Sequence, residues 1–129
     1  MVVRVVRLGT PRAPAEGVRI GTVRRPPRGV PKAEYAARNW YDVWFPNLAP
    51  SVEVMKLAQA AKTPAEWSAF FRKYRAEMAR PEAAHAIDLL ATLSQDSNFS
   101  VGCYCEDENR CHRSMLRELL REKSAKIAP

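Results

Sequence analysis

The sequence predicts a small α/β layered domain, Rossmann-like, in which a mostly parallel sheet is flanked by helices. Three short segments rich in β-branched residues have the composition of strands, and segments with helical spacing lie between the second and the third. Strands that alternate with helices favour a parallel sheet. The chain of 129 residues suffices for one core, so we expect a single domain over residues 1–129 with a frayed tail from 123 to 129.

Composition and charge exclude several classes of protein. A hydrophobic content of 47% with only five glycines is typical of a globular protein rather than a disordered one. No apolar run reaches the roughly 20 residues of a membrane span, and arginines interrupt the N-terminal stretch too often for a secretory signal. We therefore expect a cytoplasmic protein without a membrane partner. The net charge of +7 favours nucleic acid, nucleotides or smaller anions as partners.

The first two predicted strands span Val2–Leu8 and Val18–Val23, with a loop rich in proline and glycine between them. The second strand leads into Arg24–Gly29, whose paired prolines exclude a helix. This stiff loop holds three arginines at the end of a strand. Arg24 and Arg28 are therefore candidate anion-binding residues, although proline–arginine runs are also common in solvated turns.

Residues 31–50 combine a predicted helix with an aromatic segment. Pro31–Asn39 begins with proline at a first-turn position and has a helical composition. Trp40–Pro50 holds four large aromatic residues and is broken by prolines, so we expect an irregular segment that packs into the core. The alternative is a platform on which bases stack.

Further helices are predicted in the second half of the chain. Ser51 caps a helix that runs to about Lys62, and Thr63 with Glu66 forms a capping box for the next helix. A third helix begins at Pro81. The apolar residues of these last two helices recur at helical spacing and form core-facing stripes, which are Trp67, Phe70, Phe71, Tyr74 and Met78, then Ala83, Ile87, Leu90 and Leu93.

The third strand, Phe99–Tyr104, leads through a polar turn into a last amphipathic helix, and Cys103, Cys105 and Cys111 lie in or beside this turn. An odd number of clustered cysteines excludes the disulfide framework of a small secreted protein. Backbone N–H groups and the helix dipole converge where a strand meets a helix N-terminus, so the turn is a candidate anion site. If the second and third strands are parallel neighbours, this turn and the arginine loop lie at the same edge of the sheet.

These residues resemble the YeaO-like branch of the domain-of-unknown-function 488 (DUF488) family. The resemblance runs in order through Arg24 with Pro27–Gly29, Leu48–Ser51, the aromatic helix from Trp67 to Met78, and Cys103 with Cys111–Arg113. It implies a small α/β domain of a bacterial or archaeal cytoplasm with no established activity. It also implies that Cys111, His112 and Arg113 correspond to the Cys-His-Arg signature of the family and Cys103 to its upstream cysteine. Many relatives have Glu in place of Cys105.

The first functional hypothesis is a binding site for phosphate, a nucleotide or a similar anion, with thiolate chemistry as an extension. A helix N-terminus, His112 and Arg113 would lower the pKa of a neighbouring thiol, and the thiolate is the nucleophile. Either Cys111 or Cys105 would be the nucleophile, and His112 would be the base. The residues that would bind the anion are Arg24, Arg28, Arg113 and Ser114.

Two features of the turn restrict this hypothesis. The spacing from Cys105 to Arg110 is one residue shorter than cysteine phosphatases use, so a true phosphatase loop is not expected. Glu106, Asp107 and Glu108 also place negative charge in the turn, unless they face solvent or hold a metal.

Four alternatives to this hypothesis are a zinc site, a redox pair, a purely structural role of the cysteines, and a nucleic-acid-binding module. Cys103, Cys105, Cys111 and His112 supply enough ligands for zinc, although the usual gap of two residues between ligands is missing and adjacent Cys111 and His112 diverge if both are helical. A redox pair would need cysteine Cα atoms within about 7 Å. A purely structural role would bury Cys103 and Cys111. A basic nucleic-acid-binding module without catalysis rests on charge alone. We predict no cofactor, with zinc as the alternative.

Overall fold

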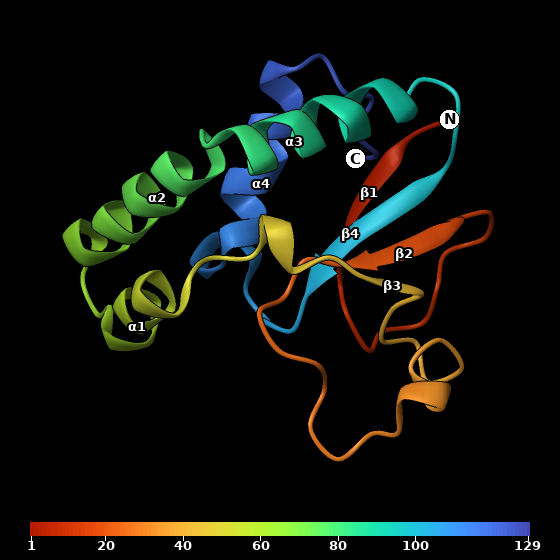
Figure 1. Ribbon diagram of the computed structural model, residues 1–129, viewed down its shortest axis with the longest axis horizontal. Coiled ribbons are helices and arrows are strands. Elements are labelled where there is room, and N and C mark those ends of the chain that lie inside the picture. Colours follow the sequence, from red (N-terminus) through yellow and green to blue (C-terminus); the bar gives the residue numbers. More distant parts are fainter.

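The computed structural model describes residues 1–129 and confirms an α/β fold with a parallel sheet. Four strands lie in the order β1–β4–β2–β3, and every pair is parallel. Figure 1 shows the sheet on one side of the molecule and the helices gathered on the other. The strands are β1 Val3–Arg7, β2 Val18–Gly21, β3 Val43–Trp44 and β4 Phe99–Cys103.

The helices begin at the signals that the sequence provides. Ser51 accepts a hydrogen bond from the N–H of Val54, and Thr63 forms the predicted capping box with Glu66. No helix is both long and apolar enough to cross a membrane. The helices are α1 Val52–Ala60, α2 Pro64–Met78, α3 Pro81–Leu93 and α4 His112–Glu122, and three short 3-10 turns are η1 Lys32–Glu34, η2 Pro46–Leu48 and η3 Glu108–Arg110.

The central strand β4 is buried along its whole length, because it has a neighbour on each side and a layer on each face. Phe99 and Val101 join Leu116 and Leu120 of α4 in the main hydrophobic core. Residues two apart in a strand share a face of the sheet. Cys103, the last residue of β4, therefore faces the helix layer as well.

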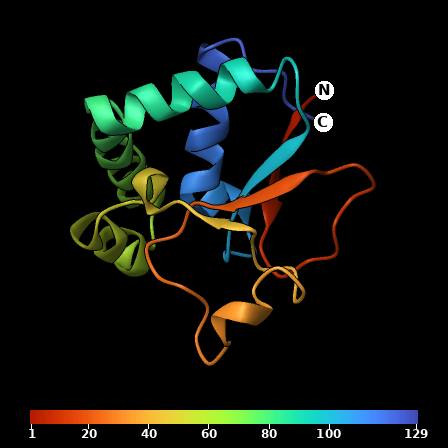
Figure 2. The same ribbon diagram turned by 45° about the vertical axis from the view of Figure 1, so that its right-hand side comes forward.

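Loops rather than helices cover the opposite face, because no helix separates β1 from β2. Arg19 of β2 is fully buried on this face and donates to both carboxylate oxygens of Glu16 at 2.8 and 3.1 Å. The carbonyls of Thr10 and Asn39 accept from the same guanidinium, and Ser100 of β4 donates to Glu16 at 2.7 Å. This network fixes the loops to the sheet, and Figure 2 shows them on the side away from the helices.

Two predictions for residues 31–50 need correction. The predicted helix over Pro31–Asn39 is a single 3-10 turn, η1, which buries no residue and so has no face to pack. Asn39 has a φ of 61°, and a residue in this left-handed conformation cannot continue an α-helix. Of the four large aromatic residues expected in the core, Tyr41 is buried, whereas Trp44 is exposed and belongs to the unpredicted edge strand β3.

The C-terminal tail is docked rather than frayed. The N–H of Val3 donates to the carbonyl of Lys126 at 2.8 Å, and the N–H of Ala128 donates to the carbonyl of Val3 at 2.9 Å. Ile127 thereby forms a parallel bridge with Val3. The tail covers the otherwise open edge of β1, which is a constraint that its own sequence does not reveal.

We expect Glu16→Gln to lower the free energy of unfolding by about 3–5 kcal/mol, because it leaves the buried charge of Arg19 without its partner. Although burial raises it, hydrogen bonds from Arg19 and Ser100 bring the pKa of Glu16 down to about 2, below its ordinary value of 4.5. This stabilisation is therefore complete above pH 4.5 and is lost as the pH falls toward 2.

Urea unfolding between pH 2 and pH 7 measures both effects. Glu106→Gln is the matched control, because Glu106 pairs with Arg7 at an exposed surface and should matter little. An equal loss in the two variants, or a Glu16→Gln protein with the same acid dependence as the unmodified chain, would contradict this account.

Candidate functional site

The ends of β2 and β4 bring two separate segments together. The strands are parallel neighbours, with Gly21 beside Gly102, so the segments that follow them leave at the same edge of the sheet. The arginine loop and the cysteine turn therefore converge, as the sequence predicts. Together with α1 they line one open cavity of about 1360 Å³.

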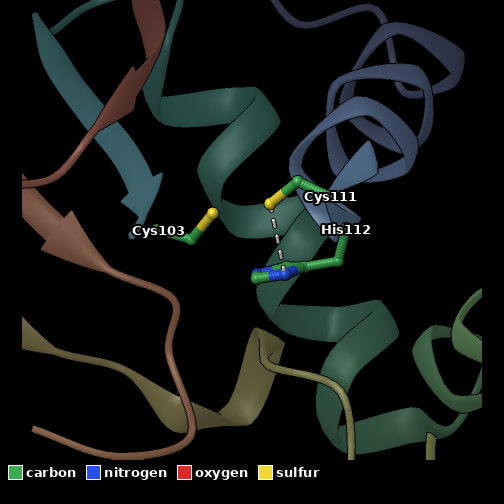
Figure 3. A group of neighbouring side chains, drawn as sticks. All are labelled: Cys103, Cys111 and His112. Atoms are coloured by element: carbon green, nitrogen blue, oxygen red, sulfur yellow. Dashed lines mark hydrogen bonds between the residues drawn. The ribbon is translucent and has the colours of Figure 1, made fainter. Parts of the chain in front are cut away.

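Cys103, Cys111 and His112 gather at the wall of this cavity (Figure 3). Their two sulfur atoms and a ring nitrogen of His112 lie within 4.8 Å of one another, and all three residues are buried. Cys111 is the N-cap of α4 and has an extended backbone, with φ −152° and ψ 149°. The divergence expected of two helical neighbours does not occur, because Cys111 precedes the first turn of the helix.

A hydrogen bond to the segment after β2 fixes the ring of His112. Its Nε2 lies 2.8 Å from the carbonyl oxygen of Thr22. Because a carbonyl can only accept, Nε2 is the protonated nitrogen and Nδ1 is the acceptor, 3.8 Å from the sulfur of Cys111. Burial lowers the pKa of His112 to about 4, although the hydrogen bond to Thr22 opposes this shift. The ring is therefore neutral near pH 7, and its free lone pair faces the thiols.

The three cysteines all line the cavity, and their thiols shift one another's pKa in different directions. Hydrogen bonds from Cys103 and Cys111 lower the pKa of Cys105 to about 2, against the effect of burial. The bonds to Cys105 and Cys111, together with burial, raise the pKa of Cys103. Cys103 lowers the pKa of Cys111, but Cys105 and burial outweigh it and raise that pKa to about 11. Of the three, the lowered pKa belongs to Cys105, which is also the exposed cysteine.

The cavity is positively charged. No Asp or Glu lines it. Of the acidic residues in the turn, Glu108 pairs with Arg117, and Asp107 accepts from a backbone N–H. Glu106 pairs with Arg7, so one cation of the lining has a carboxylate partner. The six cationic side chains of the lining are Arg7, Arg24, Arg25, Arg28, Lys56 and Arg110.

The predicted anion-binding residues differ in their placement. Arg28 lines the cavity, is exposed, and its guanidinium makes no hydrogen bond or ion pair within the chain. Arg24 also lines the cavity, but it donates to the backbone carbonyls of residues 46, 49 and 50 at 3.0–3.3 Å and so anchors the loop before α1. Of the two, Arg28 is the freer to meet a ligand.

Arg113 and Ser114 lie beneath the cavity rather than along it. Arg113 is buried and donates to the carbonyl of Cys105 at 2.6 Å. Ser114 donates to the carbonyl of Cys111 at 3.0 Å. Neither residue is part of the lining. Their placement therefore favours positioning of the cysteine turn over the direct anion contacts that the sequence suggests.

Sequence reasoning missed several residues of this site. Thr22 orients His112 through its backbone carbonyl, and its only signal was its place near the end of a predicted strand. Arg25 and Arg110 lie within the two segments already singled out, but nothing distinguished them from their neighbours. Lys56 comes from the exposed face of α1, where a lysine carries no signal at all.

The cluster also has the donors of a metal site. Cys103, Cys111 and His112 offer two sulfurs and a nitrogen at mutual distances that a tetrahedral zinc ion could bridge. The carbonyl of Thr22 would orient the histidine as outer ligands do in zinc proteins. Cys105, which lines the same cavity, is the candidate for a fourth ligand.

Comparison with known proteins gives one match. The family model described as the active DUF488-N3 subclade matches residues 3–124, which is nearly the whole chain. No curated protein and no solved structure matches. The match confirms the family expected from the motifs, whereas the YeaO-like branch stays a prediction.

We expect Cys105 to react with iodoacetamide at an undiminished rate down to about pH 5, because its pKa is lowered to about 2. A free thiol would lose reactivity below its ordinary pKa of about 8.5. Mass spectrometry after short exposures at several pH values separates the three cysteines.

The Cys103→Ala/Cys111→Ala double variant removes both hydrogen-bond donors and should return the pKa of Cys105 toward the ordinary value. Ordinary pH dependence of Cys105 in the unmodified protein would show that the thiol cluster does not hold a charge.

Proposed function

The chain belongs to the DUF488 family, whose function is unknown, and we propose that it binds a small anionic ligand of the phosphate class and acts on it through a thiolate. The family model that matches describes an active subclade, which favours a catalytic role over a purely structural one. Binding of nucleic acid by the same cations stays a prediction that rests on charge alone.

The observation that supports this proposal is the lining of the cavity. Six cationic side chains and no carboxylate surround a space that also borders the three cysteines. Cations without partners gain most from an oxyanion, because each charge-assisted hydrogen bond replaces only weakly bound water. A role in stability alone would not require cations turned toward an open cavity.

Cys105 is the nucleophile in this proposal, because it is exposed in the cavity and carries the charge of the cluster. Cys103 and Cys111 support that charge by hydrogen bonds. His112 has its Nδ1 3.8 Å from the sulfur of Cys111, where it accepts from that thiol and orients it. Arg25 and Arg28 would hold the anion over Cys105.

A zinc site is the second candidate function, and the convergence of Cys103, Cys111 and His112 within 4.8 Å favours it. A bound zinc ion would supply Lewis-acid chemistry at the wall of the cavity. The two sulfurs would then be ligands rather than hydrogen-bond donors to Cys105. The cationic lining would still attract an anion, so the two candidates differ in the role of the thiols.

We expect inorganic phosphate to bind to the cavity and to protect Cys105 from alkylation. Arg28→Gln should weaken phosphate binding about tenfold or more, because one charge-assisted hydrogen bond contributes about 1.5–3 kcal/mol. Isothermal titration calorimetry measures the affinity.

Arg72→Gln is the matched control, since Arg72 is an exposed arginine of α2 outside the cavity. The proposal fails if phosphate does not bind, or if Arg72→Gln weakens binding as much as Arg28→Gln.

For the zinc candidate, we expect one equivalent of Co²⁺ to give thiolate-to-cobalt charge-transfer absorption. Cys111→Ser should remove most of this absorption, because it replaces one of the two buried sulfur ligands. Binding of Co²⁺ only through exposed groups, with Cys111→Ser unchanged, would exclude the site.

A further inference from the structure

The cavity offers a nucleophile but neither a carboxylic acid nor an imidazole N–H as a proton donor. No carboxyl group lines it, and the one imidazole, that of His112, points its N–H at Thr22 and presents Nδ1 as an acceptor. A thiolate that attacks a phosphate ester expels an alkoxide, which a positioned acid normally protonates. This lining therefore favours a substrate whose leaving group departs as a stable anion.

The surroundings of Cys105 suit an adduct whose charge stays on sulfur. Cys103, Cys105 and Cys111 all line the cavity, and Cys105 is the exposed one of the three. A phosphorylated cysteine would place its charge on oxygens, for which arginines alone suffice. A persulfide anion on Cys105 would place it on sulfur, at the part of the lining that the other two cysteines also form.

The unpaired cations of the cavity suit a substrate that also carries an oxyanion group. Arg25, Arg28 and Arg110 line the cavity, are exposed, and their guanidinium groups make no hydrogen bond or ion pair within the chain. A doubly charged oxyanion group can take two or more of these donors at once. The cavity thus combines an exposed sulfur nucleophile with an oxyanion-binding lining.

From this combination we infer that the site transfers sulfane sulfur, with an anion of the thiosulfate class as the donor and Cys105 as the residue that accepts the sulfur. The inference rests on the proposed function and names the substrate class of the same site.

The step balances without a proton donor. The sulfur of Cys105, as thiolate, attacks the outer sulfur of thiosulfate and forms a new S–S bond. The S–S bond of thiosulfate breaks, and its electron pair leaves on sulfite. The product is a persulfide anion on Cys105. An acceptor nucleophile such as cyanide then takes the outer sulfur as thiocyanate and restores the thiolate.

The experiment uses the full chain, reduced and freed of metal with a chelator. Thiosulfate should add the mass of one sulfur atom to the peptide that contains Cys105, and cyanide should release it as thiocyanate. Cys105→Ser, an exposed substitution that should not disturb folding, should abolish both signals. Arg28→Gln should raise the half-saturating thiosulfate concentration about tenfold, whereas Arg72→Gln should leave it unchanged.

The inference is overturned if no persulfide forms, or if the sulfur is found on Cys103 or Cys111 instead. When phosphate still binds in that case, the proposed anion site stands and only the sulfur chemistry is wrong. When phosphate binding is absent as well, both proposals fail.

Discussion

The hydrogen bond from the His112 ring to the carbonyl of Thr22 is the contact on which the candidate site depends. It joins the segment after β2 to the first residue of α4 at 2.8 Å, in a buried position where water does not compete. It selects the tautomer of His112 and so turns Nδ1 toward Cys111. The parallel pairing of β2 with β4 makes the bond possible, because it places Thr22 beside the end of the strand that carries Cys103.

Some arginines of this protein fix its loops through hydrogen bonds within the chain, and others have guanidinium groups without such a partner. Arg19, Arg24 and Arg113 direct their guanidinium groups to a carboxylate or to backbone carbonyls and fix loops in place. Their planar, multiply donating groups suit that task better than lysine would. Arg25 and Arg28 follow Arg24 on the same loop but face the cavity without such partners. Anchoring by Arg24 thus holds the loop so that its neighbours stay over the cysteines.

Local signals in the sequence were sufficient for helices α1 to α4, the central strands and the meeting of the two loops, but they predicted a helix over Pro31–Asn39 that does not form. The capping box of Thr63 and Glu66 is one such signal, because both partners lie within one helical turn. Long-range contacts decided the features that the sequence did not reveal. The tail docks because Val3 has an open edge, and Cys111 converges with His112 because it caps α4 in an extended conformation. Arg24 likewise anchors its loop because it donates to backbone carbonyls more than 20 residues away in the sequence.

The central claim is that an oxyanion binds in the cationic cavity next to Cys105. A crystal structure of the protein soaked with tungstate, an oxyanion located by its anomalous scattering, tests this claim most directly. The account predicts one strong site between the guanidinium groups of Arg25 or Arg28 and the sulfur of Cys105. Tungstate bound only at scattered surface positions, with the cavity empty at the same concentration, would contradict it.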